Sequence, residues 1–479
     1  MINSTLIDLF RSLSKDELLQ FEDFVNSPFF NKKTAVVRLF NYLKDFYPKF
    51  NNTKKLERES IYRILYPGKL YNYGVIKNII YELTLLGEKF LEFICYNKNK
   101  PELYRNLLAE LINRDLKKSF KKNLKNAELL LNKERKGDIY FRNIMDIELL
   151  KFNFHIKKSG RTEKPDIDRN AGRFLISYFL IKFFKINYNN MVDMINYGKI
   201  ENIPLLDEVL NYVQKTPEID PVILLYYNKF MLLYKEDEIF YLKFKSLVRE
   251  QIKNLSRKEQ FSTYINLLNY CYGKIISGEW SYYNDLFDIY NEMIVNKIVT
   301  ITEKDYFDSV HFRLAVETAA KLKKFDWAKR FIKQYSEKLH PELKLNEINI
   351  AYANYFFMKK DYGEAQNFLA QTHISTVYDK IYIYIIQSML YYETKQFESL
   401  ISEIDAIRHF ITNDKILSIE IINSFQKYLK YLNELVKLNT SQQADKVLSI
   451  NKVKQRLNSE KGILEKHWLL EKVNSMSTN

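Results

Sequence analysis

The chain has 479 residues, of which 46% are hydrophobic and 28% are charged, and its formal net charge is +15 at pH 7. This balance is typical of a folded globular protein and excludes an intrinsically disordered chain. Only 11 glycines and 9 prolines interrupt the sequence, so the composition favours long helices over sheets with many turns.

Cysteine usage and hydropathy predict a cytoplasmic protein that does not enter a membrane. The two cysteines, Cys95 and Cys271, have no metal-binding spacing, which indicates a reducing compartment and no disulfide framework. The first residues carry charges inside their apolar run and lack the layout of a signal peptide. The longest apolar runs, FLISYFLIKFF from Phe174 and IYIYIIQSMLYY from Ile381, are shorter than the roughly 20 apolar residues of a membrane span.

Residues 1–100 predict an N-terminal helical domain. Ser14 and Glu17 occupy the two positions of a capping box ahead of LLQFEDFV, so a helix is expected to begin there. Pro28 follows it and bars helical continuation. Further helices are expected over 35–46, 59–65 and 75–90.

The last two of these helices, joined by a Pro-Gly turn, have the outline of a helix-turn-helix and resemble the winged-helix part of some bacterial regulators. The second helix would present Lys77, Asn78, Glu82 and Thr84 outward. Phosphates repel carboxylates, so Glu82 counts against contact with DNA. We expect a structural or protein-docking domain here, with nucleic-acid binding as the alternative.

Residues 101–165 predict long basic helices that end in a hinge. The stretch 111–165 holds fifteen Lys and Arg against seven Asp and Glu. Such a stripe can bind a phosphate-rich partner or simply form the solvated face of a helix. The hinge is expected over 159–172, which combines two glycines, a proline and alternating charge. The residues that could contact phosphate are Lys117, Lys118, Lys121, Lys122 and Lys125.

The stretch INIAYANYFFMKKDYGEAQNFL, residues 348–369, predicts two short helices folded back on each other around a polar turn. Its spacing resembles a tetratricopeptide repeat. That pattern has a small residue in the first helix, an aromatic residue three positions later and an alanine early in the second helix. Ala353, Phe356 and Ala365 occupy those positions, and Tyr362 follows the turn.

Two neighbouring segments repeat this arrangement. In KKFDWAKRFI, Phe325 and Ala328 stand 37 residues before Tyr362 and Ala365, with Trp327 between them. In TKQFESLISEI, Phe397 stands 35 residues after Tyr362. We therefore predict an all-α fold with an α-solenoid of tetratricopeptide-like hairpins over 166–440, sealed by a C-terminal capping helix over 441–479.

A wider resemblance covers nearly the whole chain. The segments PFFNK, LYPGKLY, PLLDEVL, LSRKEQ, LLNYCYGKIISGE, KKFDWAKRFI, NYFFMKKDYGEA and KHWLLEK occur in this order. Together they resemble a family of bacterial helical-repeat proteins of similar length. The resemblance implies a shared fold, but the family has no agreed activity, so it transfers no catalytic or binding residue.

Catalytic motifs do not appear in the sequence. There is no Walker-type phosphate loop, GxGxxG, HExxH, GxSxG or paired CxxC, and the six histidines are scattered. Asp166 with Asp168, and Glu236 to Glu238, are acidic groups typical of solvated turns, with a cation site as the alternative. We predict no cofactor, no metal site and no enzymatic activity; an enzyme with an unfamiliar site is the less favoured reading.

Two hypotheses for function follow. The first is a non-enzymatic scaffold or adaptor that holds an unidentified protein or peptide partner on the inner surface of its helical repeats. The second is a nucleic-acid-binding regulator that uses the N-terminal helices and the lysines from Lys117 to Lys125.

Overall fold

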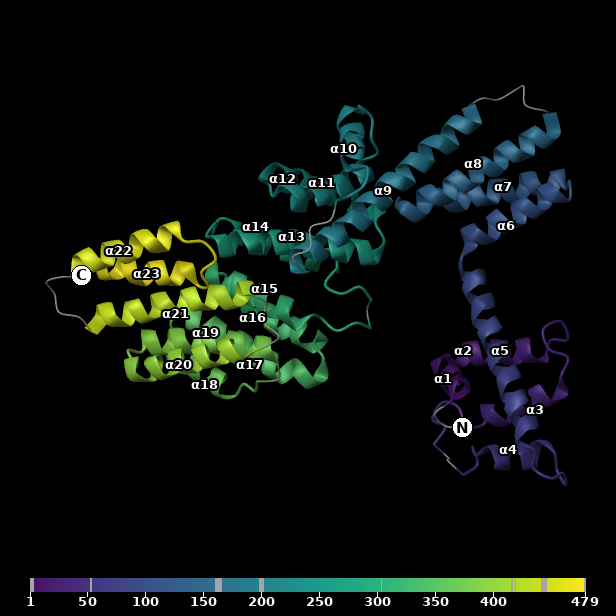
Figure 1. Ribbon diagram of the computed structural model, residues 1–479, viewed down its shortest axis with the longest axis horizontal. Coiled ribbons are helices and arrows are strands. Elements are labelled where there is room, and N and C mark those ends of the chain that lie inside the picture. The colour runs from purple at the N-terminus through teal and green to yellow at the C-terminus, as the bar shows by residue number, and fades with distance from the viewer. Residues whose placement is uncertain are drawn as a thin grey trace. The chain divides into compact units, whose positions relative to one another are not determined.

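Helices make up all the regular structure that can be described in this protein (Figure 1). The computed structural model describes residues 4–51, 54–159, 166–197, 202–302, 304–374, 376–414, 417, 419–440 and 446–477. Within these ranges there are 23 α-helices, two short 3₁₀ helices and no strand, which confirms the predicted all-α class. No described helix is both long enough and apolar enough to cross a membrane.

The chain divides into two units. Unit 1 comprises Met1–Glu134 and Ile139–Ile176, and unit 2 comprises Arg135–Asp138 and Ser177–Asn479. The division at 176 falls inside the long helix α9 (Asp166–Tyr197).

The predicted domain limits at 100, 165 and 440 stay predictions. Residues 160–165 of the expected hinge and residues 441–445 at the start of the expected C-terminal segment lie outside the described residues.

Unit 1 contains two separate hydrophobic clusters. One is built by residues between Leu6 and Phe90, and the other by residues between Leu108 and Ile147. The helices that lie wholly or mostly in unit 1 are α1 (Thr5–Ser12), α2 (Lys15–Asn26), α3 (Thr34–Lys44), α4 (Arg58–Leu65), α5 (Tyr73–Lys98), α6 (Lys100–Asn113), α7 (Lys117–Leu131) and α8 (Asp138–Ser159).

The N-terminal helices begin where the sequence predicted them. The Ser14 side chain accepts a hydrogen bond from Glu17 N, and the Glu17 carboxylate accepts one from Ser14 N, so the capping box at the start of α2 is confirmed. Helix α5 runs to Lys98 instead of ending near residue 90, because residues 91–98 contain neither the glycine nor the proline that would stop it.

Unit 2 is a succession of helices joined mostly by short turns. Its elements after α9 are α10 (Leu206–Lys215), α11 (Pro221–Lys235), α12 (Glu238–Gln251), η1 (Ile252–Asn254), α13 (Arg257–Ser277), α14 (Tyr282–Val295), α15 (Ser309–Lys321), α16 (Phe325–Tyr335), η2 (Ser336–Lys338), α17 (Pro341–Met358), α18 (Tyr362–Ala370), α19 (Val377–Glu393), α20 (Phe397–Asn413), α21 (Ile419–Thr440), α22 (Lys446–Ser459) and α23 (Lys466–Ser477).

Consecutive helices of unit 2 pack in pairs. Helix α11 packs on α12, α13 on α14, α15 on α16, α17 on α18 and α19 on α20. The first helices of successive pairs also touch, since α15 contacts α17 and α17 contacts α19. Figure 1 shows α17 to α20 lying side by side.

Three of these pairs share one turn geometry. Helices α15, α17 and α19 are each followed by a lysine with positive φ: Lys323 at 57°, Lys360 at 64° and Lys395 at 58°. In each turn the next residue donates its N–H to the carbonyl five residues earlier, at 2.8 to 3.0 Å. This is the Schellman motif, which satisfies the last carbonyls of a helix. The three lysines stand 37 and 35 residues apart. These are the spacings between the three repeated segments of the sequence, so each segment contains the same helix-ending turn.

The predicted repeat-core residues differ in burial according to their size. Ala328, Ala353 and Ala365 are completely buried, each at 0% exposure. The absence of a larger side chain at Ala353 and Ala365 lets α17 and α18 approach closely. The five aromatic residues are only partly buried: Phe325, Trp327, Phe356, Tyr362 and Phe397.

The C-terminal helices add a final layer to unit 2. Ile450, Val453 and Leu457 of α22 are buried. In α23, Trp468 donates its Nε1–H to Glu393 Oε1 of α19 at 2.8 Å. The side chains of α22 and α23 therefore complete the hydrophobic cluster that begins in α17.

Replacing Lys360 with glycine is expected to raise the free energy of unfolding by about 0.5 to 1 kcal/mol, because glycine adopts a positive φ without the steric cost of a Cβ atom. The matched control is Lys359→Gly, one residue earlier at φ −76°, where glycine only adds entropy to the unfolded chain. Urea unfolding measures both changes. A Lys360→Gly protein no more stable than the Lys359→Gly protein would contradict this account.

Candidate functional site

A cavity of about 360 Å³ lies within unit 2, and five helices contribute one face each to its wall. The helices are α13, α15, α17, α19 and α21, and the turn before α23 adds the last segment. Most of the lining is aliphatic, with a few polar groups among it. This combination of an apolar wall and few polar side chains is typical of a binding pocket.

Helical periodicity explains why these helices line the cavity. In α15 the lining residues are Val310, Arg313, Leu314 and Glu317, which follow the i, i+3, i+4, i+7 spacing of one helix face. In α19 the lining runs from Ile381 to Met389 with the same period. Each helix therefore presents the side chains of one face to the cavity.

Arg313 occupies a buried position at the cavity wall, with 4% of its surface exposed. Its Nε lies 3.1 Å from Glu347 Oε2 of α17, and its Nη1 lies 2.9 Å from Asp379 Oδ1 of α19. Asp379 is also the capping-box residue of α19, where it pairs with Thr376. The Arg313 guanidinium stands over the ring of Tyr382 at 5.2 Å, a cation–π arrangement. One side chain of α15 thus lies within ion-pair distance of carboxylates on both α17 and α19.

A second group of charges surrounds Lys321, two turns further along α15 than Arg313. Its Nζ lies 2.7 Å from Glu317 Oε1 and 3.0 Å from Glu465 Oε1, and it donates to Tyr283 Oη at 3.0 Å. The Tyr382 hydroxyl donates a hydrogen bond to the other Glu317 oxygen. Glu465 precedes α23, so this ion pair fastens the C-terminal turn to α15 beside the cavity.

Burial and neighbouring charges shift the pKa values of these groups. Burial raises the pKa of Glu347 to about 7, although Arg313 acts in the opposite direction. Burial lowers the pKa of Lys321, but the carboxylates of Glu317 and Glu465 outweigh it, so its pKa is raised well above the ordinary value. Burial, assisted by the Glu317 carboxylate, raises the pKa of Tyr382 well above its ordinary value. Lys321 is therefore protonated and Tyr382 neutral near pH 7.

Asn354 of α17 is the other polar residue of interest in the wall. It is 7% exposed, and its Oδ1 accepts no hydrogen bond from the described residues. A buried polar atom without a partner costs free energy. The fold therefore leaves this oxygen unsatisfied beside the cavity.

The predicted repeat-core residues do not line this cavity. They pack between helices instead: Trp327, for example, stacks on Phe331 with ring centroids 4.9 Å apart and donates to Asn291 Oδ1 at 2.9 Å. Sequence reasoning missed the polar residues of the cavity. A polar residue inside an apolar helical run was the available signal, and it is carried by Arg313, Glu317 and Asn354.

The predicted basic cluster lies on α7, which belongs to unit 1, whereas the cavity belongs to unit 2. All five of its lysines are exposed. Lys117 lies 3.4 Å from Asp115. Among the described residues, no carboxylate lies within ion-pair distance of the other four, which are Lys118, Lys121, Lys122 and Lys125.

The helix-turn-helix outline corresponds to α4 and α5. Lys77 and Asn78 are exposed on α5, but the Glu82 carboxylate pairs with Lys33. Thr84 donates its hydroxyl to Ile80 O at 2.8 Å. Two of the four residues that would face a nucleic acid are therefore engaged with the protein itself.

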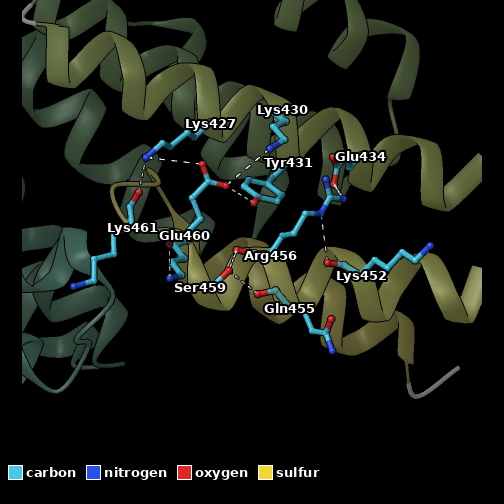
Figure 2. Close-up of polar contacts among 11 residues, drawn as sticks. Lys427, Lys430, Tyr431, Glu434, Lys452, Gln455, Arg456, Ser459, Glu460 and Lys461 are labelled. Carbon is cyan, nitrogen blue, oxygen red and sulfur yellow. Dashed lines mark hydrogen bonds and ion pairs between the residues drawn. The ribbon is translucent and has the colours of Figure 1, made fainter.

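Helices α21 and α22 carry a further polar cluster, and Figure 2 shows its side chains facing one another across the two helices. Arg456 donates to Glu434 Oε2 at 2.8 Å, and Lys427 donates to Lys461 O at 2.7 Å. Tyr431 donates to Glu460. These contacts join the two helices and the turn that follows them. A structural role therefore accounts for this polar cluster.

The part of the chain that the structure describes contains no group of three or more His, Cys, Asp or Glu residues that could hold a metal ion. Cys271 is buried, with its sulfur 3.1 Å from the Tyr241 hydroxyl. Asp237 caps α12 through a hydrogen bond from Ile239 N. The side chains of Asp166 and Asp168 lie outside the described residues.

Comparison of the chain with protein-family models, with curated proteins and with solved structures finds no match. The candidate function therefore depends on the geometry of the site.

Replacing Glu347 with glutamine is expected to remove one source of pH-dependent stability. The pKa of Glu347 rises from 4.5 to about 7 on folding, so the folded state binds the proton more tightly. The wild-type free energy of unfolding should therefore fall by up to about 3 kcal/mol as pH rises through this interval, and the glutamine variant should lack that fall.

Urea unfolding at about pH 5 and about pH 8 measures this effect. The stability of Glu347→Gln relative to wild type should increase with pH, whereas the exposed control Glu398→Gln should show a constant difference. A difference for Glu347→Gln that does not change with pH would show that this carboxyl is ionised throughout.

Proposed function

We propose that the protein is a non-enzymatic scaffold or adaptor, and that the cavity of unit 2 receives a side chain of a bound protein or peptide. The observation that carries this proposal is the cavity itself: one face from each of five helices, mostly aliphatic, encloses about 360 Å³. That volume suits one large side chain, and a pocket lined mostly by apolar side chains can bury the anchor residue of a partner.

The helix packing supports a tetratricopeptide-like solenoid as the basis of this scaffold. Paired helices, contacts between the first helices α15, α17 and α19, and Schellman turns after each of them are features expected of stacked hairpins. The cavity lies against these same first helices. Solenoids use an extended concave surface for binding, and we assign the cavity to such a surface.

The polar groups of the cavity favour binding over catalysis. Lys321 makes contacts with two carboxylates and a hydroxyl, and an ammonium held in this way is a poor base or nucleophile. Glu317 is engaged by Lys321 and Tyr382. Groups that are already paired in the folded protein serve to shape and orient a site.

Blocking the mouth of the cavity tests the proposal. Val310 lines the cavity and is 46% exposed, so Val310→Trp should fill the entrance without disturbing the core. The control is Val295→Trp, at a position that is 79% exposed and outside the lining. We expect the purified protein to bind members of a random peptide array, and Val310→Trp to lose about tenfold or more in affinity for them.

Equal melting temperatures of the two tryptophan variants would establish that both are folded. If wild type binds no peptide, or if Val310→Trp binds as well as Val295→Trp, the cavity is not a peptide site.

Nucleic-acid binding is the second candidate, and the exposed lysines of α7 are the observation that favours it. If they contact phosphates, affinity for duplex DNA or RNA should fall steeply between about 50 mM and about 200 mM salt. Changing Lys118, Lys121, Lys122 and Lys125 to glutamine should reduce the slope of log K against log salt by up to about 4.

The control removes the same charge from unit 2 by changing the exposed Lys243, Lys253, Lys329 and Lys333 to glutamine. Fluorescence anisotropy with labelled duplexes measures the affinity of both variants at each salt concentration. The two quadruple variants could show equal slopes of log K against log salt, or the wild type could fail to bind at low salt. Either result would mean that the α7 lysines only form a solvated helix face.

A further inference from the structure

The charged groups of the cavity wall balance one another. Arg313, Glu317 and Glu465 are the charged residues that line the cavity. Lys321 contacts both glutamates, so these four residues carry two positive and two negative charges. Arg313 is itself paired, with carboxylates of α17 and α19 that do not line the cavity. A charged ligand group would lose its water here and find no free counter-charge, which costs free energy. The wall therefore favours an uncharged occupant.

Two hydroxyl groups of the wall are free to bind such an occupant. They belong to Tyr272 of α13 and Ser424 of α21. Within the part of the chain that the structure describes, neither hydroxyl makes a hydrogen bond, and neither is fully buried. The third hydroxyl of the wall, that of Tyr382, already donates to Glu317. Because a hydroxyl can both donate and accept, Tyr272 and Ser424 can pair with a neutral polar group.

The proton of the Tyr272 hydroxyl stays in place near neutral pH. Burial, assisted by the carboxylate of Glu317, raises the pKa of Tyr272 above its ordinary value. The hydroxyl is therefore a neutral donor under the conditions in which a ligand would bind.

The apolar part of the wall sets the size of the occupant. It includes Ile385, Ile386 and Met389 of α19, Phe425 of α21 and Leu464 before α23. A cavity of about 150 Å³ is already large enough for a benzene ring, and this one measures about 360 Å³. A large aromatic side chain therefore fits. Tyrosine and tryptophan combine a large apolar ring with one neutral polar group, and that group usually finds a hydrogen-bond partner when it is buried.

We infer that the cavity binds a tyrosine or tryptophan of the partner, with the ring against the apolar wall and the phenol O–H or indole N–H hydrogen-bonded to Tyr272 or Ser424. This rests on the proposed function and specifies the residue that the partner contributes. A tyrosine side chain and a small free phenol share this chemistry, so the experiment has to separate the two sources.

The test uses arrays of short peptides with randomised flanks around one fixed residue: tyrosine, tryptophan, phenylalanine, lysine or glutamate. The full-length protein is the probe. We expect the tyrosine and tryptophan arrays to bind about fivefold more tightly than the phenylalanine array, because their polar group gains a hydrogen bond. They should bind at least about tenfold more tightly than the lysine and glutamate arrays. p-Cresol, measured by calorimetry, forms the small-molecule arm.

A double variant localises the effect. Tyr272→Phe combined with Ser424→Ala removes both hydroxyls with little change in side-chain volume. This protein should bind the tyrosine and phenylalanine arrays equally, and its affinity for the phenylalanine array should stay that of wild type. The control is Tyr212→Phe combined with Ser402→Ala, at two exposed positions outside the lining, which should keep the fivefold preference. Melting temperatures confirm that both proteins are folded.

The outcomes separate the two proposals. Peptide binding that Val310→Trp removes, but that shows no preference for tyrosine or tryptophan over phenylalanine, overturns the inference and leaves the proposed function standing. A preference that survives the loss of both hydroxyls has the same consequence. No peptide binding by wild type overturns both proposals. Binding of p-cresol without binding of any tyrosine-containing peptide assigns the site to a free phenol and overturns the peptide source.

Discussion

The burial of Arg313 is the constraint on which the arrangement of unit 2 depends. A guanidinium with 4% exposure cannot be left without counter-charges, because an unpaired buried ion costs several kcal/mol. Its two carboxylates come from different helices, Glu347 on α17 and Asp379 on α19. The two ion pairs therefore connect α15 with both α17 and α19.

The same constraint shapes the cavity. Arg313 points from α15 toward its neighbours, and Lys321, two turns further on, draws Glu465 from the C-terminal segment to the same helix. The hydrophobic cluster of α17 to α23 packs closely, helped by the alanines at 353 and 365. Between this packed region and the charged side of α15 there remains a space that aliphatic side chains line but do not fill.

These features are the reason why we propose a binding role for the site. The charges that approach the cavity are paired within the protein, and their pKa values keep Lys321 protonated and Tyr382 neutral near pH 7. Such groups give a fixed electrostatic pattern at little reorganisation cost when a ligand enters.

The sequence by itself determined the helical class, the capping box at Ser14 and the period of the turns in unit 2. These depend on residues within a few positions of one another, so local physical rules suffice. It could not show that residues from α13 to Glu465 meet around one cavity, because that depends on contacts across as many as 144 positions. Arg313, Glu317 and Asn354 look in the sequence like isolated polar residues in apolar helices. Only the tertiary structure decides whether such residues face solvent, a counter-charge or a binding site.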